Sequence, residues 1–137
     1  MTAPNISNPT YFAAASPVRL PRAAALGPGL GGQPRLLVDA PAGAAEIYLH
    51  GATVTSWTPS GGSEVIFTSR QAVFNGSTAI RGGIPLCLPE FGVGINGDAV
   101  PKHGWARIAP WQLRTVTGTD DGGVRALLSV SRDHLTA

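Results

Sequence analysis

Glycine and proline are the residues that most constrain what this chain can fold into. Its 137 residues include 18 glycines and 12 prolines, roughly twice the usual share of these two residue types. Glycine destabilises a helix through its backbone entropy, and proline lacks the N–H that a helix interior needs. We therefore predict a β-leaning, turn-rich protein rather than a helical bundle.

The balance of apolar and charged residues favours a folded domain. Hydrophobic residues make up 43% of the chain and charged residues 13%, whereas disordered tails combine low hydrophobicity with high net charge. The length suits one ordinary domain. Residues 1–34 are rich in Ala, Pro and Gly and are predicted to form a flexible lead-in, and residues 35–137 are predicted to form the domain.

Several short stretches have the pattern of β-strands. Ala45, Ile47 and Leu49 recur at every second residue, which is typical of a half-buried strand. The Asp-Gly pair at residues 121–122 indicates a hairpin turn. Residues 69–110 are dense in glycine and proline and are predicted to form long loops, which in compact domains are usually functional or disordered. The predicted strands span residues 35–39, 45–50, 52–58, 64–68, 111–117 and 124–131.

Two segments within these loops carry residues suited to chemistry. Arg81 precedes two glycines, so the backbone there can approach a ligand closely; the alternative is a simple turn with Arg81 pointing to solvent. In the second segment, His103 can move a proton near neutral pH, and Arg107 can form paired hydrogen bonds with a carboxylate or phosphate. The alternative for His103 is a structural role beside Trp105.

The sequence contains no motif for a metal site, a nucleic-acid partner or a membrane partner. The three histidines are far apart in sequence and have no cysteine pair, so no metal site is predicted. The formal net charge is only +2 and the cations are scattered, so no nucleic-acid partner is expected. No apolar run approaches the roughly 18 residues of a membrane helix, so no membrane partner is expected. His50, at the end of an alternating stretch, is predicted to be a surface or sheet-face residue.

The cellular compartment is predicted from the cysteine count and the start of the chain. The single cysteine, Cys87, cannot form an internal disulfide bond, so nothing demands an oxidising compartment. The first residues lack the apolar stretch of a signal peptide. We therefore predict a cytoplasmic location.

Four motifs occur in a fixed order along the chain. They are Gly51-Ala52-x-Val54-x-Ser56-Trp57-x-Pro59, Phe74-x-Gly76-x-x-Ala79-Ile80-Arg81-Gly82-Gly83-Ile84-Pro85, Pro89-x-Phe91-Gly92 and His103-Gly104-Trp105-Ala106-Arg107-x-x-x-Trp111. This ordered set, over about residues 35–131, resembles the hexose-6-phosphate mutarotases (glucose-6-phosphate 1-epimerases) of the aldose 1-epimerase superfamily. Leu88 and Glu90 depart from the aromatic-rich pattern of that family.

The resemblance implies a fold, a reaction and roles for three residues. The fold would be an antiparallel β-sandwich of the galactose mutarotase-like type, a supersandwich. The reaction would interconvert the α and β anomers of a hexose 6-phosphate by acid–base ring opening, so no cofactor or metal is expected. Arg81 and Arg107 would bind the phosphorylated hexose, and His103 would bind and polarise it near the reacting centre.

Members of this family are substantially longer, and their general-acid His and general-base Glu lie in the second half. The chain therefore resembles the N-terminal half, a truncated sandwich without those two residues. A half sandwich leaves a sheet edge and an apolar face uncovered, so the expected partners are a complementing C-terminal half or a second copy. Two other functions stay open: a non-catalytic phosphosugar- or carbohydrate-binding β domain using the same three residues, and an inactive fragment.

Overall fold

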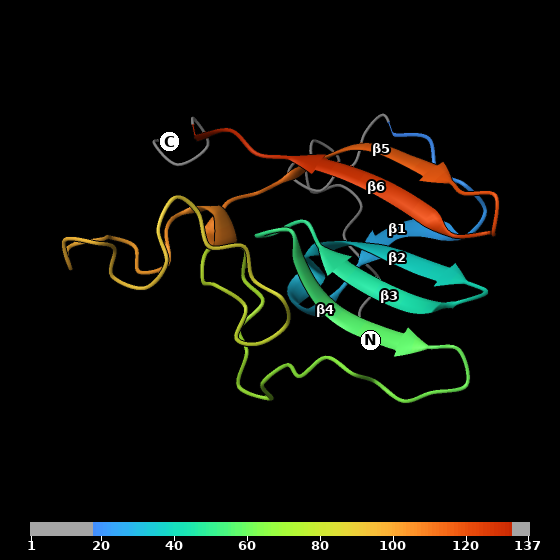
Figure 1. Ribbon diagram of the computed structural model, residues 1–137, viewed down its shortest axis with the longest axis horizontal. Coiled ribbons are helices and arrows are strands. Elements are labelled where there is room, and N and C mark those ends of the chain that lie inside the picture. Colours follow the sequence, from blue (N-terminus) through green and yellow to red (C-terminus); the bar gives the residue numbers. More distant parts are fainter. Residues whose placement is uncertain (1–17, 133–137) are drawn as a thin grey trace.

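In the computed structural model, which describes residues 18–132, the chain forms two antiparallel sheets (Figure 1). The four-stranded sheet has the order β1 (Ala24–Pro28), β2 (Pro34–Ala40), β3 (Gly43–Tyr48) and β4 (Thr53–Pro59). The two-stranded sheet is the hairpin of β5 (Gln112–Gly118) and β6 (Val124–Ser129). Two 3-10 turns, η1 (Leu30–Gly32) and η2 (Ala106–Ile108), are the helical elements of the described residues. The predicted all-β antiparallel fold is confirmed.

The two sheets pack against each other through a small apolar core. Leu36 of β2 and Leu49, just after β3, are 0% and 1% exposed and cluster with two side chains of β5, Leu113 and Val116. Because side chains alternate along a strand, one face of each sheet supplies this core and the other faces away. Partly buried apolar side chains pack around the cluster, among them Leu26, Val38, Ile47, Val124, Ala126 and Leu128.

One strand lies within the segment predicted to be a flexible lead-in. β1 pairs with β2 along its whole length, and Leu26 packs onto the core. The predicted boundary at residue 34 is therefore wrong for β1, because backbone pairing and apolar burial hold it in the sheet. Residues 1–17 lie outside the described residues.

The strand predicted at residues 64–68 does not form a ladder. The Glu64 carboxylate accepts hydrogen bonds from two hydroxyl groups of β4 and, at 3.1 Å, from the Trp57 backbone N–H. A neighbouring strand would bind that N–H at the edge of β4, and the carboxylate takes its place. Pairing is reduced to the Val65 N–H donating to the Trp57 carbonyl at 3.0 Å and an isolated bridge at Thr68.

Residues 60–111, here called the loop segment, connect β4 to β5. Figure 1 shows most of this segment at one end of the sheets, in green to orange. The prediction of loops over residues 69–110 is confirmed, with η2 as the helical turn described there. No helix within residues 18–132 is long and apolar enough to cross a membrane. Isolated backbone bridges fix the loop segment to the strands and to itself: His50 with Pro110, Val54 with Ile84, Thr68 with Gly82, and Leu88 with Gly104.

Candidate functional site

The backbone around Arg81 packs directly on the scaffold. Gly82 and Gly83 have φ angles of +116° and +71°, which glycine adopts at low cost. A Cβ at Gly82 would lie 2.6 Å from the Phe67 carbonyl oxygen, and a Cβ at Gly83 would lie 2.5 Å from the Val54 carbonyl oxygen. The two glycines thus permit a close approach that fixes where the Arg81 side chain leaves the backbone.

Arg107 lies in η2. In its guanidinium, Nη2 has a hydrogen-bond acceptor and Nε has none among the described residues. The Trp111 indole N–H donates to the Ala106 carbonyl at 2.8 Å and closes the turn. Nη2 of Arg107 donates to the Lys102 carbonyl at 3.1 Å, whereas Nε is buried without a hydrogen-bond partner among the described residues. A buried donor without an acceptor is costly, so this guanidinium is suited to an oxygen of a ligand.

His103 is held by the backbone of Gly92. The backbone N–H of His103 donates to the Gly92 carbonyl at 2.7 Å, and the ring Nδ1 of His103 accepts from the Gly92 backbone N–H at 2.9 Å. The ring centroid lies 5.0 Å from that of Phe91. Since Nδ1 is an acceptor, a neutral ring carries its proton on Nε2.

The charge state of His103 follows from its surroundings. Burial first, and then the positive charges of Arg107 and Lys102, lower the pKa of His103 below its usual value of 6.5. The ring is therefore neutral at pH 7. A neutral ring with its proton on Nε2 can donate a hydrogen bond to a ligand at this nitrogen.

One cavity of about 770 Å³ brings the three predicted residues together. Arg81, His103 and Arg107 all line it, with Lys102 beside them, and its volume falls within the roughly 300–1,000 Å³ of small-molecule sites. Arg81 is exposed, and His103 and Arg107 are half-buried. No carboxylate belongs to the lining, and residues 18–132 hold no cluster of three or more His, Cys, Asp or Glu side chains that could bind a metal ion. The cavity is thus electropositive and suits a small anion.

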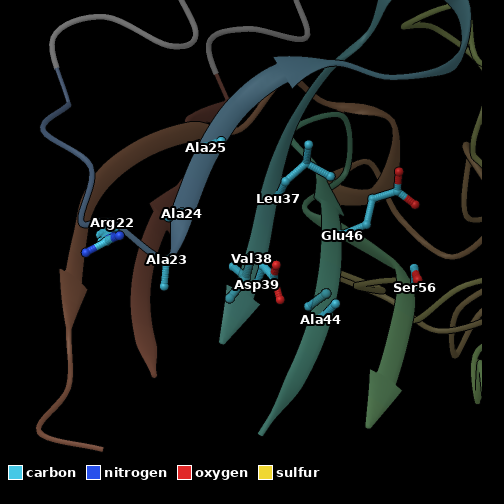
Figure 2. A pocket seen from close by; sticks show the side chains of 11 residues that line it. Arg22, Ala23, Ala24, Ala25, Leu37, Val38, Asp39, Ala44, Glu46 and Ser56 are labelled. Carbon is cyan, nitrogen blue, oxygen red and sulfur yellow. The ribbon is translucent and has the colours of Figure 1, made fainter. Parts of the chain in front are cut away.

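A second cavity, of about 490 Å³, lies over the strands of the four-stranded sheet. Figure 2 shows side chains around it from four neighbouring strands, including Ala25, Leu37, Glu46 and Ser56. Its Glu46 carboxylate is already paired with Arg35, and much of the remaining lining is alanine. We therefore assign the candidate site to the larger cavity, which gathers several cationic side chains.

His50 does not line the larger cavity but contacts a residue that does. A surface position, one of the two predicted for it, is wrong, because His50 is only 5% exposed. Its Nε2 lies 2.8 Å from the carbonyl oxygen of Thr78, a residue that lines the larger cavity. Burial lowers the pKa of His50, and the hydrogen bond to Thr78 opposes this effect. Its place between an apolar alternating stretch and Gly51 was the signal available in the sequence.

Known proteins similar to this chain decide its family. Residues 34–135 match the family described as aldose 1-epimerase, which is well over half of the chain. This chain belongs to the aldose 1-epimerase family. The resemblance found from the four ordered motifs is therefore confirmed at the level of the family.

Several curated proteins are similar to parts of the chain. A protein of Salmonella typhimurium named "Putative glucose-6-phosphate 1-epimerase" is 37% identical over 101 residues, which are 74% of this chain and 34% of the relative. A protein of the same name from Escherichia coli is 40% identical over 87 residues, 64% of this chain and 29% of the relative. A third, from Cenchrus ciliaris, is 49% identical over 69 residues, 50% of this chain and 20% of the relative.

Solved structures support the same fold. A structure described as a "putative mutarotase (YeaD)" from Salmonella typhimurium has 32% sequence identity and a TM-score of 0.74, covering 91% of this chain and 42% of that one. The protein described as HI1317 has 32% identity and a TM-score of 0.66, covering 81% and 44%. The predicted galactose mutarotase-like sandwich is confirmed. The matches span a fifth to a third of the curated relatives and less than half of the solved chains.

Proposed function

We propose that this chain provides the phosphosugar-binding part of a hexose-6-phosphate mutarotase, a glucose-6-phosphate 1-epimerase. The observation that carries the proposal is the common cavity of Arg81, His103 and Arg107. The family supports a reaction on an aldose, and the relatives from Salmonella typhimurium and Escherichia coli carry the glucose-6-phosphate 1-epimerase name. The electropositive lining supports a phosphorylated substrate over a neutral one.

The two arginines bind the phosphate of the substrate in this proposal. A guanidinium presents several N–H groups in a fixed plane and matches phosphate oxygens in pairs, which a lysine ammonium cannot do. The unpaired Nε of Arg107 is buried, so it gains an acceptor when the side chain shifts to meet an entering anion. Lys102, which also lines the cavity, adds a third positive charge at its rim.

His103 polarises the sugar rather than removing a proton. Its Nε2–H donates a hydrogen bond to the ring oxygen or to the hydroxyl at C1, and its lowered pKa keeps it neutral in that role. In the reaction a base takes the proton of the C1 hydroxyl while an acid protonates the ring oxygen, and the bond between C1 and that oxygen breaks. Rotation about C1–C2 then allows closure on the other face.

The base that takes the proton of the C1 hydroxyl has no carboxylate candidate at this cavity. Its lining includes no carboxylate among the described residues, which favours a second function, a non-catalytic phosphosugar-binding β domain. We propose that catalysis requires a complementing segment that corresponds to the remaining length of the relatives, or a second copy of the chain. A cytoplasmic location and the absence of a cofactor stay predictions.

Anomer exchange of glucose 6-phosphate, followed by NMR magnetisation transfer, tests the proposal. The chain is added at several concentrations, and binding is measured in parallel by calorimetry with glucose 6-phosphate and with glucose. Faster exchange that His103→Ala abolishes would support a mutarotase. Binding of the phosphosugar without faster exchange would support the binding domain, and equal affinity for glucose and glucose 6-phosphate would contradict both.

A further inference from the structure

The bend between β3 and β4 contacts both arginine-bearing segments. The backbone of the bend contacts the segment that follows η2. The Gly51 N–H donates to the Ala109 carbonyl at 2.8 Å, and His50 forms a backbone bridge with Pro110. The His50 side chain of the bend contacts the segment that precedes Arg81, through the 2.8 Å contact between His50 Nε2 and the Thr78 carbonyl. Ala109 lies two residues after Arg107, and Thr78 lies three residues before Arg81.

The His50 side chain is a fixed, buried donor. The residue is only 5% exposed, and the backbone carbonyl of His50 accepts a hydrogen bond from the Thr53 hydroxyl at 3.1 Å. The Thr78 carbonyl can only accept, so Nε2 of His50 carries the proton. A buried donor that lost this acceptor would be costly to leave unpaired, which keeps the contact closed.

The turn on the far side of this contact is held by its own hydrogen bonds, and Phe74 just before it packs against Tyr48 of β3, with 4.9 Å between the ring centroids. The Asn75 side-chain oxygen accepts hydrogen bonds from the backbone N–H groups of Ser77 and Thr78 at 3.0 and 2.8 Å. These bonds hold residues 75–78 together but do not tie them to a sheet. The His50 side chain therefore provides the hydrogen bond that attaches this turn to the end of β3.

We propose that His50 is a positioning residue that sets the placement of Arg81 relative to Arg107. It holds one arginine segment through its side chain and the other through the backbone of the same bend, so the backbones of both segments are tied to one point of the scaffold. This tie adds to the close packing of Gly82 and Gly83 on the strands. The proposal deepens the proposed function and rests on it where ligand affinity is concerned. The placement of the turn itself does not depend on any ligand.

Two substitutions at His50 and one matched control test the proposal. His50→Leu removes the donor with little change in volume, and His50→Gln restores a side-chain N–H at a similar reach. Thr53→Val removes the neighbouring buried hydroxyl but leaves the contact with Thr78 intact. Amide hydrogen exchange of peptides covering residues 75–84 reports the turn, and calorimetry with glucose 6-phosphate reports the site.

The expected pattern separates positioning from general destabilisation. His50→Leu raises exchange over residues 75–84 and weakens phosphosugar binding by about three- to tenfold, the range of one hydrogen bond, while His50→Gln restores both and Thr53→Val changes neither. Unchanged exchange in His50→Leu, or a Gln variant identical to the Leu variant, would overturn the proposal. If the wild-type chain does not bind glucose 6-phosphate, the proposed function fails, and the exchange data still decide the role of His50.

Discussion

The packed strands and the loop segment are held together in different ways. The strands bury a shared apolar core, in which Leu36 is fully buried, and they pair over continuous ladders. The loop segment leaves large apolar side chains exposed, with Ile95 and Val100 100% and 94% accessible. Isolated bridges and single hydrogen bonds attach it to the strands.

The strands therefore supply the stability of the fold, and the loop segment supplies the residues predicted to bind a ligand. All three predicted site residues lie in the loop segment, and the scaffold contributes by fixing their backbone. Binding residues often lie on loops that a rigid scaffold positions. Substitutions in the core should therefore lower the free energy of unfolding, whereas substitutions at the cavity should change affinity with little loss of stability.

The largest expected effect is in the core. Leu36→Ala should lower the free energy of unfolding by about 2–5 kcal/mol, because it removes buried methyl groups and leaves a cavity. Urea denaturation measures this change. Leu127→Ala is the matched control, since Leu127 is an exposed leucine of β6; equal losses for the two variants would contradict the assignment of the core.

The next effect concerns ligand affinity. Arg81→Ala should weaken glucose 6-phosphate binding by roughly 1.5–3 kcal/mol, the range of hydrogen bonds to charged groups, without lowering the thermal midpoint, because Arg81 is exposed. Calorimetry and a thermal scan measure the two quantities. Arg125→Ala removes another exposed arginine, on β6, and should leave affinity unchanged; a similar loss of affinity there would indicate general electrostatic attraction only.

A pair of glycines tests the contact between the two regions. Gly83 and Gly61 have nearly equal φ angles, +71° and +73°, but only at Gly83 would a Cβ meet backbone, the Val54 carbonyl. Gly83→Ala should therefore destabilise the chain more than Gly61→Ala, by about 1–3 kcal/mol, the range for forcing extra atoms into a packed site, and should weaken phosphosugar binding. Denaturation curves of both variants provide the comparison, and equal curves would show that the close approach does not matter.

The smallest effect is a pH dependence that arises from His50. Burial lowers the pKa of folded His50 below 6.5, so the unfolded chain binds a proton first as the pH falls. Stability should therefore decline as the pH decreases below about 6.5 and level off below the folded pKa. His50→Gln should show a smaller decline between pH 7.5 and 5; an unchanged pH profile in this variant would contradict the burial of a neutral imidazole.

The strands that could be predicted were those with a strong local pattern. β3 and β6 alternate apolar and outward-facing side chains, and Asp-Gly marks the turn after β5. β1 was missed because Ala-Ala-Leu-Gly-Pro has neither β-branched residues nor alternation, and its position depends on pairing with β2. The strand expected at residues 64–68 had the right composition, but the Glu64 carboxylate occupies the edge of β4.

The site was predictable in part. The order of the motifs singled out Arg81, His103 and Arg107, and the structure brings them to one cavity, although their roles stay predictions. Local sequence could not reveal that His50 is buried against Thr78, because this contact joins residues 28 positions apart. The backbone packing beside Arg81 could not be predicted either, because Gly82 and Gly83 pack on backbone from other segments.

The most direct test of the phosphosugar site is an amide chemical-shift titration of the folded chain with glucose 6-phosphate. We expect the largest shifts around Gly82, Gly83, Gly92 and His103, with small changes over β1 to β3. Shifts centred instead on the cavity of Figure 2, around Ala25 and Leu37, or no shifts at millimolar ligand, would contradict this expectation.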